Sequence, residues 1–290
     1  MKYHFIINGK SGKDNKSLLE AKIREACFKR KINYDITYTK RPSDAKRIAA
    51  EFPDEESVIF SVGGDGNLND TLNGIVGSEN KILGVIPAGS GNDFARTLKN
   101  FDDGIHSIDI GSINNRFFIN VACVGLDADV ADNVSITREK KWIPTSQRFN
   151  ASFVYTYFKY SPKKVKIRMG ENEAEGEITI LAICNAQYYG SGYKIAPHAL
   201  LDDGLFDIYL VKKMPKIKIL PMLASLARGK HEKFSAIKRY QESEIHVESD
   251  EKLSFNVDGE LVRGTSFDLK IHKAAIRIFN DKQFIKEVLK

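Results

Sequence analysis

Short apolar runs alternate with amphipathic segments through the N-terminal part of the chain. A run such as residues 58–62, which is almost uniformly apolar, is typical of a strand buried on both faces of a sheet. The segments between the runs repeat their apolar residues every three or four positions, as a helix with one buried face does. The expected strands are 3–7, 34–38, 58–62 and 82–86, and a helix follows each of them. This alternation predicts an α/β domain with a parallel sheet and helices on both faces.

The second part of the chain has a different pattern. From residue 165 onward strand patterns dominate, at 165–169, 177–185, 206–211, 244–248, 253–257 and 266–272. Short strands without helices between them are typical of a β-sandwich-like domain. Helical spacing returns only at 216–228 and at the C-terminus. The sequence therefore predicts an α/β domain at 1–124, a mainly β domain at 125–278 and a C-terminal helix within 279–290 that packs back on the first domain.

The composition is that of a soluble globular protein, with 42% apolar and 28% charged residues among 290. The net charge of +6 is unevenly distributed, because residues 208–240 hold nine Lys and Arg against the single acid Glu232. Such a stretch favours anionic partners such as lipid head groups, although a solvated basic face explains it equally well. No apolar run approaches the roughly 20 residues that span a bilayer. We therefore expect a cytoplasmic protein that meets membranes from the surface.

The cysteines do not indicate a metal site or a disulfide framework. Cys27, Cys123 and Cys184 are far apart and include no Cys-x-x-Cys pair. Buried, reduced thiols are the default for such residues in a cytosolic protein.

Two glycine-rich turns follow predicted strands. Gly63-Gly64-Asp65-Gly66 comes after 58–62, and residues 87–92 (Pro-Ala-Gly-Ser-Gly-Asn) come after 82–86. Ligands of parallel sheets bind at the carboxyl ends of the strands, and a glycine turn before a helix points N–H groups at an anion. A negatively charged carboxylate next to phosphate groups is reasonable only if it orients an Mg²⁺ ion, a basic group or a hydroxyl. Asp65 in this loop therefore indicates phosphoryl transfer. Walker and dinucleotide motifs are excluded, because Ile7 and Asn69 stand where glycine is required.

Taken in order, the polar motifs resemble those of the bacterial diacylglycerol kinase-like lipid kinases, which are related to sphingosine and ceramide kinases. The motifs are residues 8–13, 63–66, 69–73, 87–93, 125–128, 188–192, 202–207 and 256–260. NAD kinases and phosphofructokinases share the Gly-Gly-Asp-Gly turn, but the full series covers nearly the whole chain. The resemblance implies an ATP-dependent kinase that phosphorylates a lipid alcohol such as diacylglycerol, with Mg²⁺, in a cleft between a nucleotide-binding domain and a β-rich acceptor domain.

The resemblance also implies roles for single residues around the nucleotide. Those that would line it are Asn8, Ser11, Lys13, Thr39, Gly63, Gly64, Gly66, Asn67, Gly89, Ser90 and Asn92. Lys13 would act as a point charge on the phosphates. Asp65, Asp93 and Asp127 would converge, with Asn92, into a water-bridged Mg²⁺ network. For Asp93, capping the helix that follows is a serious alternative.

In the second domain the resemblance implies a structural metal and a catalytic base. Asp203 would hold Mg²⁺ together with carbonyls such as those of Leu200 and Leu205, and plain turn chemistry is the alternative. Asp258 would take the proton of the acceptor hydroxyl with help from Glu260, and Asp65 would support catalysis through the metal. An Asp-Gly pair is also a strong hairpin signal, so Asp258 has a structural alternative as well.

Two positions depart from the family pattern on the phosphate side. Asn67 stands where Thr is usual and Asp70 where Glu is usual, so a nucleotide- or lipid-binding regulator with weakened catalysis is one alternative. A kinase of a soluble acceptor, as NAD kinases are, is another, although apolar residues within 208–240 favour a membrane surface. Nucleic acid is not expected, because the basic stretch has no motif for it. The sequence leaves open the acceptor lipid, ATP over GTP, and the oligomeric state, with a homodimer as one option.

Overall fold

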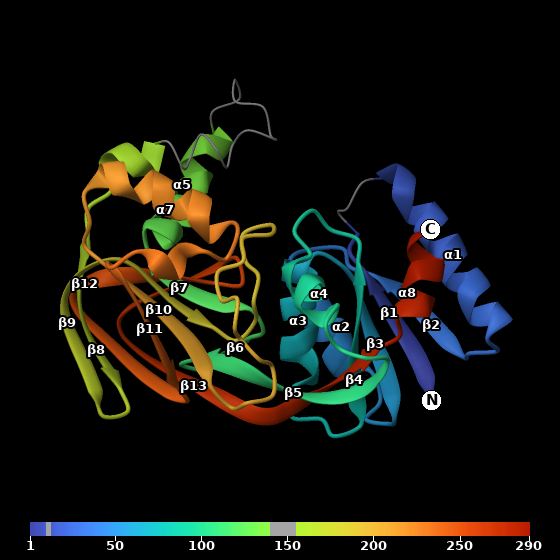
Figure 1. Ribbon diagram of the computed structural model, residues 1–290. Helices are drawn as coiled ribbons and strands as arrows, with labels where there is room; N and C mark the ends of the chain where they lie inside the picture. Colours follow the sequence, from blue (N-terminus) through green and yellow to red (C-terminus); the bar gives the residue numbers. More distant parts are fainter. Residues whose placement is uncertain (10–12, 140–154) are drawn as a thin grey trace.

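The computed structural model describes residues 1–9, 13–139 and 155–290, and its two halves differ in architecture (Figure 1). The first half alternates strands with helices: β1 (Lys2–Ile7), α1 (Lys13–Lys29), β2 (Tyr34–Tyr38), α2 (Asp44–Glu51), β3 (Ser57–Gly63), α3 (Asp65–Ile75), β4 (Lys81–Pro87) and α4 (Asp93–Leu98). These strands pair in parallel in the order β4-β3-β1-β2. The predicted α/β domain with a parallel sheet is confirmed.

Each face of this sheet has its own apolar core, because successive strand residues point to opposite sides. On one face, Phe5 and Phe60 stack with their ring centroids 4.9 Å apart, and α1 and α8 (Lys282–Leu289) cover them. On the other face, Ile59 packs against α2 and α3 through residues such as Leu72. Both faces are covered around the central strands β3 and β4, which is why these two strands are almost continuously apolar rather than alternating.

The second half is mainly β, as predicted. Its elements are β5 (Gly104–Ile113), β6 (Arg116–Phe118), β7 (Val121–Gly125), α5 (Leu126–Glu139), β8 (Lys163–Met169), β9 (Asn172–Cys184), β10 (Phe206–Lys212), α7 (Lys216–Leu226), a 3₁₀ turn (His231–Lys233), β11 (Ile237–Glu242), β12 (Glu244–Val257) and β13 (Glu260–Asn280). Strands β7 to β12 pair with antiparallel neighbours around one core, while α5 and α7 cover a second core on the outside. Because β7 pairs with β9 and β12, this domain begins a few residues before the expected boundary at 124.

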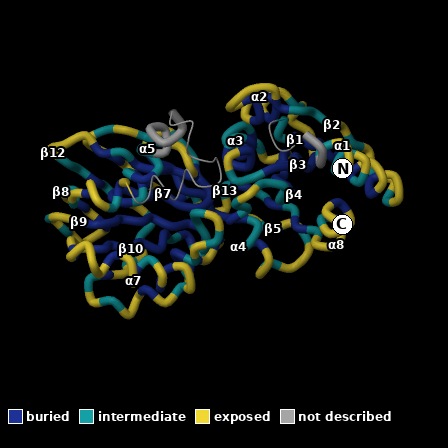
Figure 2. Tube along the Cα trace, turned by 90° about the horizontal axis from the view of Figure 1, so that it is seen from above, coloured by how far each residue is buried: buried dark blue, intermediate teal, exposed yellow. Residues whose placement is uncertain are grey.

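Strands β5 and β13 join the two domains into one sheet. β13 pairs with β12 of the second domain and with β5, whose residues contribute to the cores of both domains. The last residues of β13 pair in parallel with β4 of the first domain. The sequence predicted only a short strand at 266–272 and none at 104–113. Figure 2 shows buried segments continuing through β13 from one domain to the other. The domains are therefore held by shared backbone hydrogen bonds and not by a linker.

Two general features of the described residues complete the fold. Cys27, Cys123 and Cys184 are buried free thiols, and burial raises the pKa of Cys27 to about 11. Within the ranges that the structure describes, no helix has both the length and the apolar content to cross a membrane.

The C-terminal helix gives a direct test of the first core. Phe284 of α8 is fully buried and contacts the rings of Tyr3, Phe5 and Phe60. We expect Phe284→Ala to lower the free energy of unfolding by about 3 to 5 kcal/mol, because it leaves a cavity among these rings. Urea denaturation measures it. Leu289→Ala on the same helix, where the side chain is 41% exposed, should cost less than about 1 kcal/mol. Equal losses for the two variants would contradict the packing of α8.

Candidate active site

The two glycine-rich loops lie against each other at the carboxyl ends of β3 and β4. These strands pair in parallel with Gly63 opposite Pro87, and the Ala88 N–H donates to the Gly63 carbonyl at 2.9 Å. A Cβ built on Gly89 would lie 2.3 Å from the Cα of Gly64, so the two backbones meet where a side chain would not fit. Helix α3 starts directly after Gly64, and its first N–H groups have no partner within the helix. This edge of the sheet therefore has the character of an anion site.

Asn92 shapes the second loop with its own side chain. Its Oδ1 accepts the Gly89 N–H at 3.0 Å, and its Nδ2 donates to the Gly89 carbonyl at 2.7 Å. The residue has φ 57°, a left-handed conformation that asparagine tolerates. Ser90 is exposed at the tip of the loop that this clamp closes.

The first loop, after β1, is anchored on Thr39. The Thr39 Oγ1 accepts the Gly9 N–H at 2.9 Å, and a Cβ on Gly9 would lie 1.9 Å from the Thr39 carbonyl oxygen. Asn8 lies between this loop and Gly63, since its Cβ is 3.2 Å from where a Gly63 Cβ would be. Ser11 lies outside the described residues, and Lys13 is the first residue of α1. Thr39 thus supports the loop expected to bind phosphate.

The structure corrects the expectation for Asn67. Its side chain is buried and points into the sheet, where Nδ2 donates to the Ser61 hydroxyl at 2.8 Å and to the Ile6 carbonyl at 3.2 Å. A carboxamide has only two donor hydrogens, so neither is left for a phosphate. Nor does Asn67 cap the helix, because α3 begins at Asp65 with Gly64 at its N-cap.

Asp65 and Asp93 open helices α3 and α4 and lie close enough for their charges to interact. Asp65 Oδ1 accepts the Phe94 N–H at 3.2 Å, which ties the two helix starts together. Asp93 Oδ2 accepts the Ser191 N–H at 2.8 Å, and its Oδ1 lies 3.0 Å from Nη1 of Arg96. Burial raises the pKa of the Asp93 carboxyl, and the Asp65 charge adds to the rise.

Asp127 lies in the first turn of α5 and is bonded within the second domain. Its Oδ2 accepts the Tyr189 hydroxyl at 2.8 Å and the Asn256 Nδ2 at 3.4 Å, and Asn256 also donates to the Tyr189 oxygen. Burial raises the pKa of the Asp127 carboxyl. Asp93 and Asp127 are thus held by Ser191 and Tyr189, two residues apart on one loop.

These carboxylates do not form a direct metal-ligand set. Across 1–9, 13–139 and 155–290, no group of three or more His, Cys, Asp or Glu side chains is arranged to hold a metal ion. Asp65, Asp93 and Asp127 instead accept hydrogen bonds from protein donors. The water-bridged network that the resemblance implies stays a prediction.

The turn at 202–205 bears on the predicted structural metal. Asp203 Oδ1 accepts the Leu205 N–H at 3.0 Å, and buried Asp109 accepts the Gly204 N–H at 2.6 Å. Burial raises the pKa of the Asp203 carboxyl, and the charges of Asp207 and Asp109 add to it. Leu200 is exposed, whereas the Leu201 carbonyl accepts the Asp109 N–H. The acidic surroundings suit a cation, but the turn is already held by its own hydrogen bonds.

The Asp258 carboxylate is buried and accepts hydrogen bonds from four donors. Its Oδ2 accepts Nδ2 of Asn69 and the Ile119 N–H, both at 2.8 Å, and its Oδ1 accepts the Asn120 and Val121 N–H groups at 3.1 and 3.0 Å. Burial raises its pKa to about 6, against the lowering effect of these donors. An ionised carboxylate has about four acceptor positions, and all are in use. The Asp-Gly hairpin between β12 and β13 thus inserts a carboxylate into the domain junction.

Sequence reasoning did not assign roles to Asn69 and Asn73 of α3. Besides donating to Asp258, Asn69 accepts a hydrogen bond from Nη2 of Arg116 through its Oδ1, at 3.4 Å. The Asn73 side chain donates to the Phe117 carbonyl and accepts the Phe117 N–H. The spacing of four residues, which puts both on one helix face, is the signal that could have found them. Arg116 in turn pairs with Glu260 at 2.6 Å, and Glu260 is 49% exposed. Glu260 therefore lies at the surface beside the buried network.

An apolar pocket opens beside this site in the second domain. Its volume is about 320 Å³, and Asp127 and Tyr189 contribute polar groups to its lining. Apolar side chains make up most of the remaining wall: Cys123, Leu126, Val130, Ile180, Tyr193, Ile195, Leu220, Leu223, Ala224, Leu226 and Ala227. Gly190 also lines it, and the next residue, Ser191, bonds Asp93. The pocket and the glycine-rich loops are therefore connected through one short loop.

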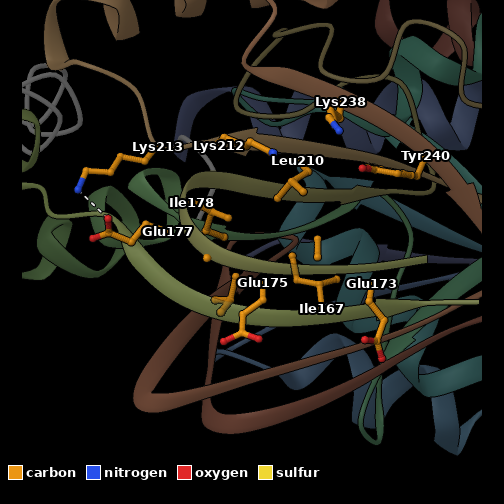
Figure 3. A pocket seen from close by; sticks show the side chains of 13 residues that line it. Ile167, Glu173, Glu175, Glu177, Ile178, Leu210, Lys212, Lys213, Lys238 and Tyr240 are labelled. Atoms are coloured by element: carbon orange, nitrogen blue, oxygen red, sulfur yellow. Dashed lines mark hydrogen bonds and ion pairs between the residues drawn. The ribbon is translucent and has the colours of Figure 1, made fainter. Parts of the chain in front are cut away.

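A second hollow lies elsewhere in the β domain, between β9 and the β10–β11 pair (Figure 3). Glu173, Glu175 and Glu177 line one side, and lysines line the other. Lys213 Nζ lies 2.6 Å from Glu177 Oε2 across it. None of its lining residues belongs to the glycine-rich loops, so this groove is separate from the candidate active site.

Both domains match known families. Residues 2–116 match the diacylglycerol kinase catalytic domain, and residues 120–280 match the YegS C-terminal NAD kinase beta sandwich-like domain. The chain therefore belongs to the diacylglycerol kinase family.

Individual relatives agree with this family. A diacylglycerol kinase of Bacillus subtilis is 30% identical and aligns with 71% of this chain and 72% of its own length. One of Staphylococcus epidermidis is 28% identical over 98% of this chain and 93% of its own. The structure of a diacylglycerol kinase from Bacillus anthracis has the same fold, with a TM-score of 0.71 at 20% identity over 98% of each chain.

The contact between the glycine-rich loops gives a stability test. Gly89→Ala would push a methyl group into the Gly64 backbone, so we expect it to lower the free energy of unfolding by about 1 to 3 kcal/mol. Gly66 has nothing within 4 Å of an added Cβ and lies inside α3, so Gly66→Ala should change it by less than about 1 kcal/mol, toward higher stability. Urea titrations of both variants measure this difference. Equal stability of the two would show that the loops do not touch.

Proposed function

We propose that this protein is an ATP-dependent lipid kinase that transfers the γ-phosphoryl group of Mg²⁺-bound ATP to the hydroxyl of a lipid alcohol such as diacylglycerol. The observation that carries the proposal is the apolar pocket next to the glycine-rich loops in a chain of this family. Its wall suits hydrocarbon chains, and Asp127 and Tyr189 in its lining suit a hydroxyl or ester group. A soluble acceptor, the main alternative, gains nothing from such a wall.

On the nucleotide side, the protein's task is positioning and charge stabilisation. The backbone N–H groups of the loops at 63–66 and 87–92 would face the phosphates, because these loops meet at the start of α3. Lys13, at the start of α1, would add a positive charge. Mg²⁺ would arrive with ATP as part of the substrate, and Asp65 is the carboxylate at the loop edge that could orient its waters.

On the acceptor side, Asp258 is the candidate base. The lipid oxygen would bond to the γ-phosphorus as the bond to the leaving ADP oxygen breaks, and the hydroxyl proton would pass to Asp258. A pKa of about 6 keeps this carboxylate ionised at neutral pH yet basic enough to accept a proton. Since its acceptor positions are occupied, the hydroxyl must replace one donor, and Asn69 contributes the side-chain donor among them. Glu260 would assist through its charge and its pairing with Arg116.

A nucleotide- or lipid-binding regulator with weakened catalysis is a second candidate. It is favoured by the Asn67 amide, which is used inside the sheet, and by the saturated Asp258 carboxylate. The regulator would bind its ligand with little or no phosphate transfer, so turnover separates the two candidates.

A lipid-panel assay tests the proposed function. Purified protein with ATP and Mg²⁺ should transfer phosphate to at least one lipid alcohol presented in mixed micelles. NAD is the control acceptor and should not be phosphorylated. ATP binding without transfer to any lipid would refute the kinase proposal and favour the regulator.

The role of Asp258 has its own test. A base acts only when deprotonated, so kcat/KM should fall about tenfold per pH unit below about pH 6. Asp258→Asn should reduce turnover at least 100-fold and abolish this acid limb. The substitution should also lower the free energy of unfolding by about 3 kcal/mol, because the new NH₂ group would face backbone N–H donors that need an acceptor. Asp250→Asn, at an exposed position of β12, is the control. Turnover by Asp258→Asn that keeps the acid limb would rule out Asp258 as the base.

A further inference from the structure

Helix α7 is apolar on both of its sides although only one of them is buried. Ile219, Met222 and Leu226 pack into the second domain. On the opposite side, Ile217 is 79% and Leu220 is 48% exposed. Together with the exposed Pro221 and Ala224, these positions recur three or four residues apart and so share one helix face. Beyond Lys216 and Lys218 at its start, α7 thus has apolar residues on both sides, and an exposed apolar side is typical of a surface that meets an apolar neighbour.

Two further segments extend this apolar surface. The Lys216 Nζ donates to the Phe158 carbonyl at 2.7 Å, and the Tyr157 hydroxyl donates to the Lys216 carbonyl at 2.9 Å, which places residues 155–159 beside α7 (Figure 1). Phe158 is 71% exposed. Tyr193, 40% exposed, lines the apolar pocket together with Leu220. The set of Phe158, Tyr193, Ile217 and Leu220, with the cations around it, is called the α7 face below.

The structure divides the nine basic residues of 208–240 into two groups. Lys213 and Arg239 pair with acids at 2.6 and 2.5 Å, and Lys212 and Lys238 line the groove opposite the glutamates (Figure 3). The others lie on α7 or shortly after it: Lys216, Lys218, Arg228, Lys230 and Lys233. Residues 212–231 contain no Asp or Glu. Among the residues that the structure describes, most cations of this stretch that form no ion pair with an acid are therefore those that flank the exposed apolar residues.

We propose that the α7 face docks on a bilayer that contains anionic lipids. Phe158, Ile217 and Leu220 enter the boundary of the acyl chains, and cations such as Lys218 and Arg228 lie among the head groups. A second copy of the chain fits this face poorly, because a symmetric contact would set its cations against one another.

The inference rests on the proposed function, because the docked face leads into the apolar pocket. Leu220, Ala224 and Ala227 belong to both the pocket wall and the exposed side of α7 or its C-cap. A lipid can then pass from the bilayer to the pocket along α7 without exposing its chains to water. Docking thereby presents the acceptor to the cleft that holds Asp127 and Tyr189.

The apolar part of the face is tested by vesicle co-sedimentation. Neither Phe158 nor Ile217 lines the pocket. The double variant Phe158→Asp/Ile217→Asp should bind vesicles of phosphatidylcholine and phosphatidylglycerol at least ~30-fold more weakly, from the lost burial of two large side chains. The control is Phe28→Asp/Ile105→Asp, which changes side chains of the first domain that are 82% and 45% exposed. It should bind like the wild type.

The charged part is tested at constant net charge. The triple variant Lys218→Glu/Arg228→Glu/Lys230→Glu should bind these vesicles ~100-fold or more weakly, because each basic residue near an anionic surface contributes about fivefold in affinity. Its affinity for vesicles of pure phosphatidylcholine should change little. Lys282→Glu/Lys286→Glu/Lys290→Glu has the same net charge but changes exposed residues of the C-terminal segment of the first domain. It should keep most of the binding.

A dispersed substrate separates docking from catalysis. With short-chain diacylglycerol below its aggregation concentration, the Phe158→Asp/Ile217→Asp variant should keep wild-type turnover while losing activity on vesicles. Unchanged vesicle binding by this variant would overturn the docking proposal. So would a dimer of the wild type that dissociates in the variant, because the face would then be a protein interface. If the double variant loses vesicle binding but the wild type phosphorylates no lipid, the docking proposal stands and the lipid kinase proposal is refuted.

Discussion

The geometry of the candidate active site depends on the hydrogen bonds around the Asp258 carboxylate. An unpaired buried carboxylate costs several kcal/mol, so it is stable only where donors surround it. Here the donors are three consecutive backbone N–H groups, at 119–121, and Asn69 of α3. These bonds fix the β12–β13 hairpin, the start of β7 and the helix that follows the Gly-Gly-Asp-Gly turn relative to one another. In the proposed kinase, this network would set the distance between the glycine-rich loops and the candidate base.

The loop at 188–193 adds a second connection between the two sides. Its Ser191 N–H bonds Asp93 of the first domain, and its Tyr189 bonds Asp127 of the second. The same loop lines the apolar pocket through Tyr189, Gly190 and Tyr193. A chain that fills the pocket therefore touches the loop that holds a carboxylate at the start of α4. The loop at 188–193 is thus a direct physical contact between the apolar pocket and the start of α4.

Much of the first domain was predictable because its signals are local. The strands at 34–38 and 82–86 were correctly placed, since each is a short run with turn residues at its ends. The meeting of the two glycine-rich loops also followed, because the carboxyl ends of parallel strands share one edge. Local rules fail at Ser43: serine is a preferred N-cap residue, but this one has φ 61° and makes no side-chain cap bond to α2. They also failed for β5, whose burial comes from pairing with β13, over 150 residues away in the sequence.

By itself, the sequence determined the two architectures, the glycine-rich loops and the series of motifs that defines the family. These features depend on periodicity, on glycine geometry and on motif spacing, all of which can be read from the order of residues in the chain. Only the tertiary structure decided which polar groups satisfy one another. It turned Asn67 into the sheet, saturated Asp258, kept Asp65, Asp93 and Asp127 from forming a direct metal-ligand set and paired Lys213 and Arg239 with acids. The reason is that hydrogen bonds and ion pairs depend on distances between residues far apart in sequence, which only the folded chain fixes.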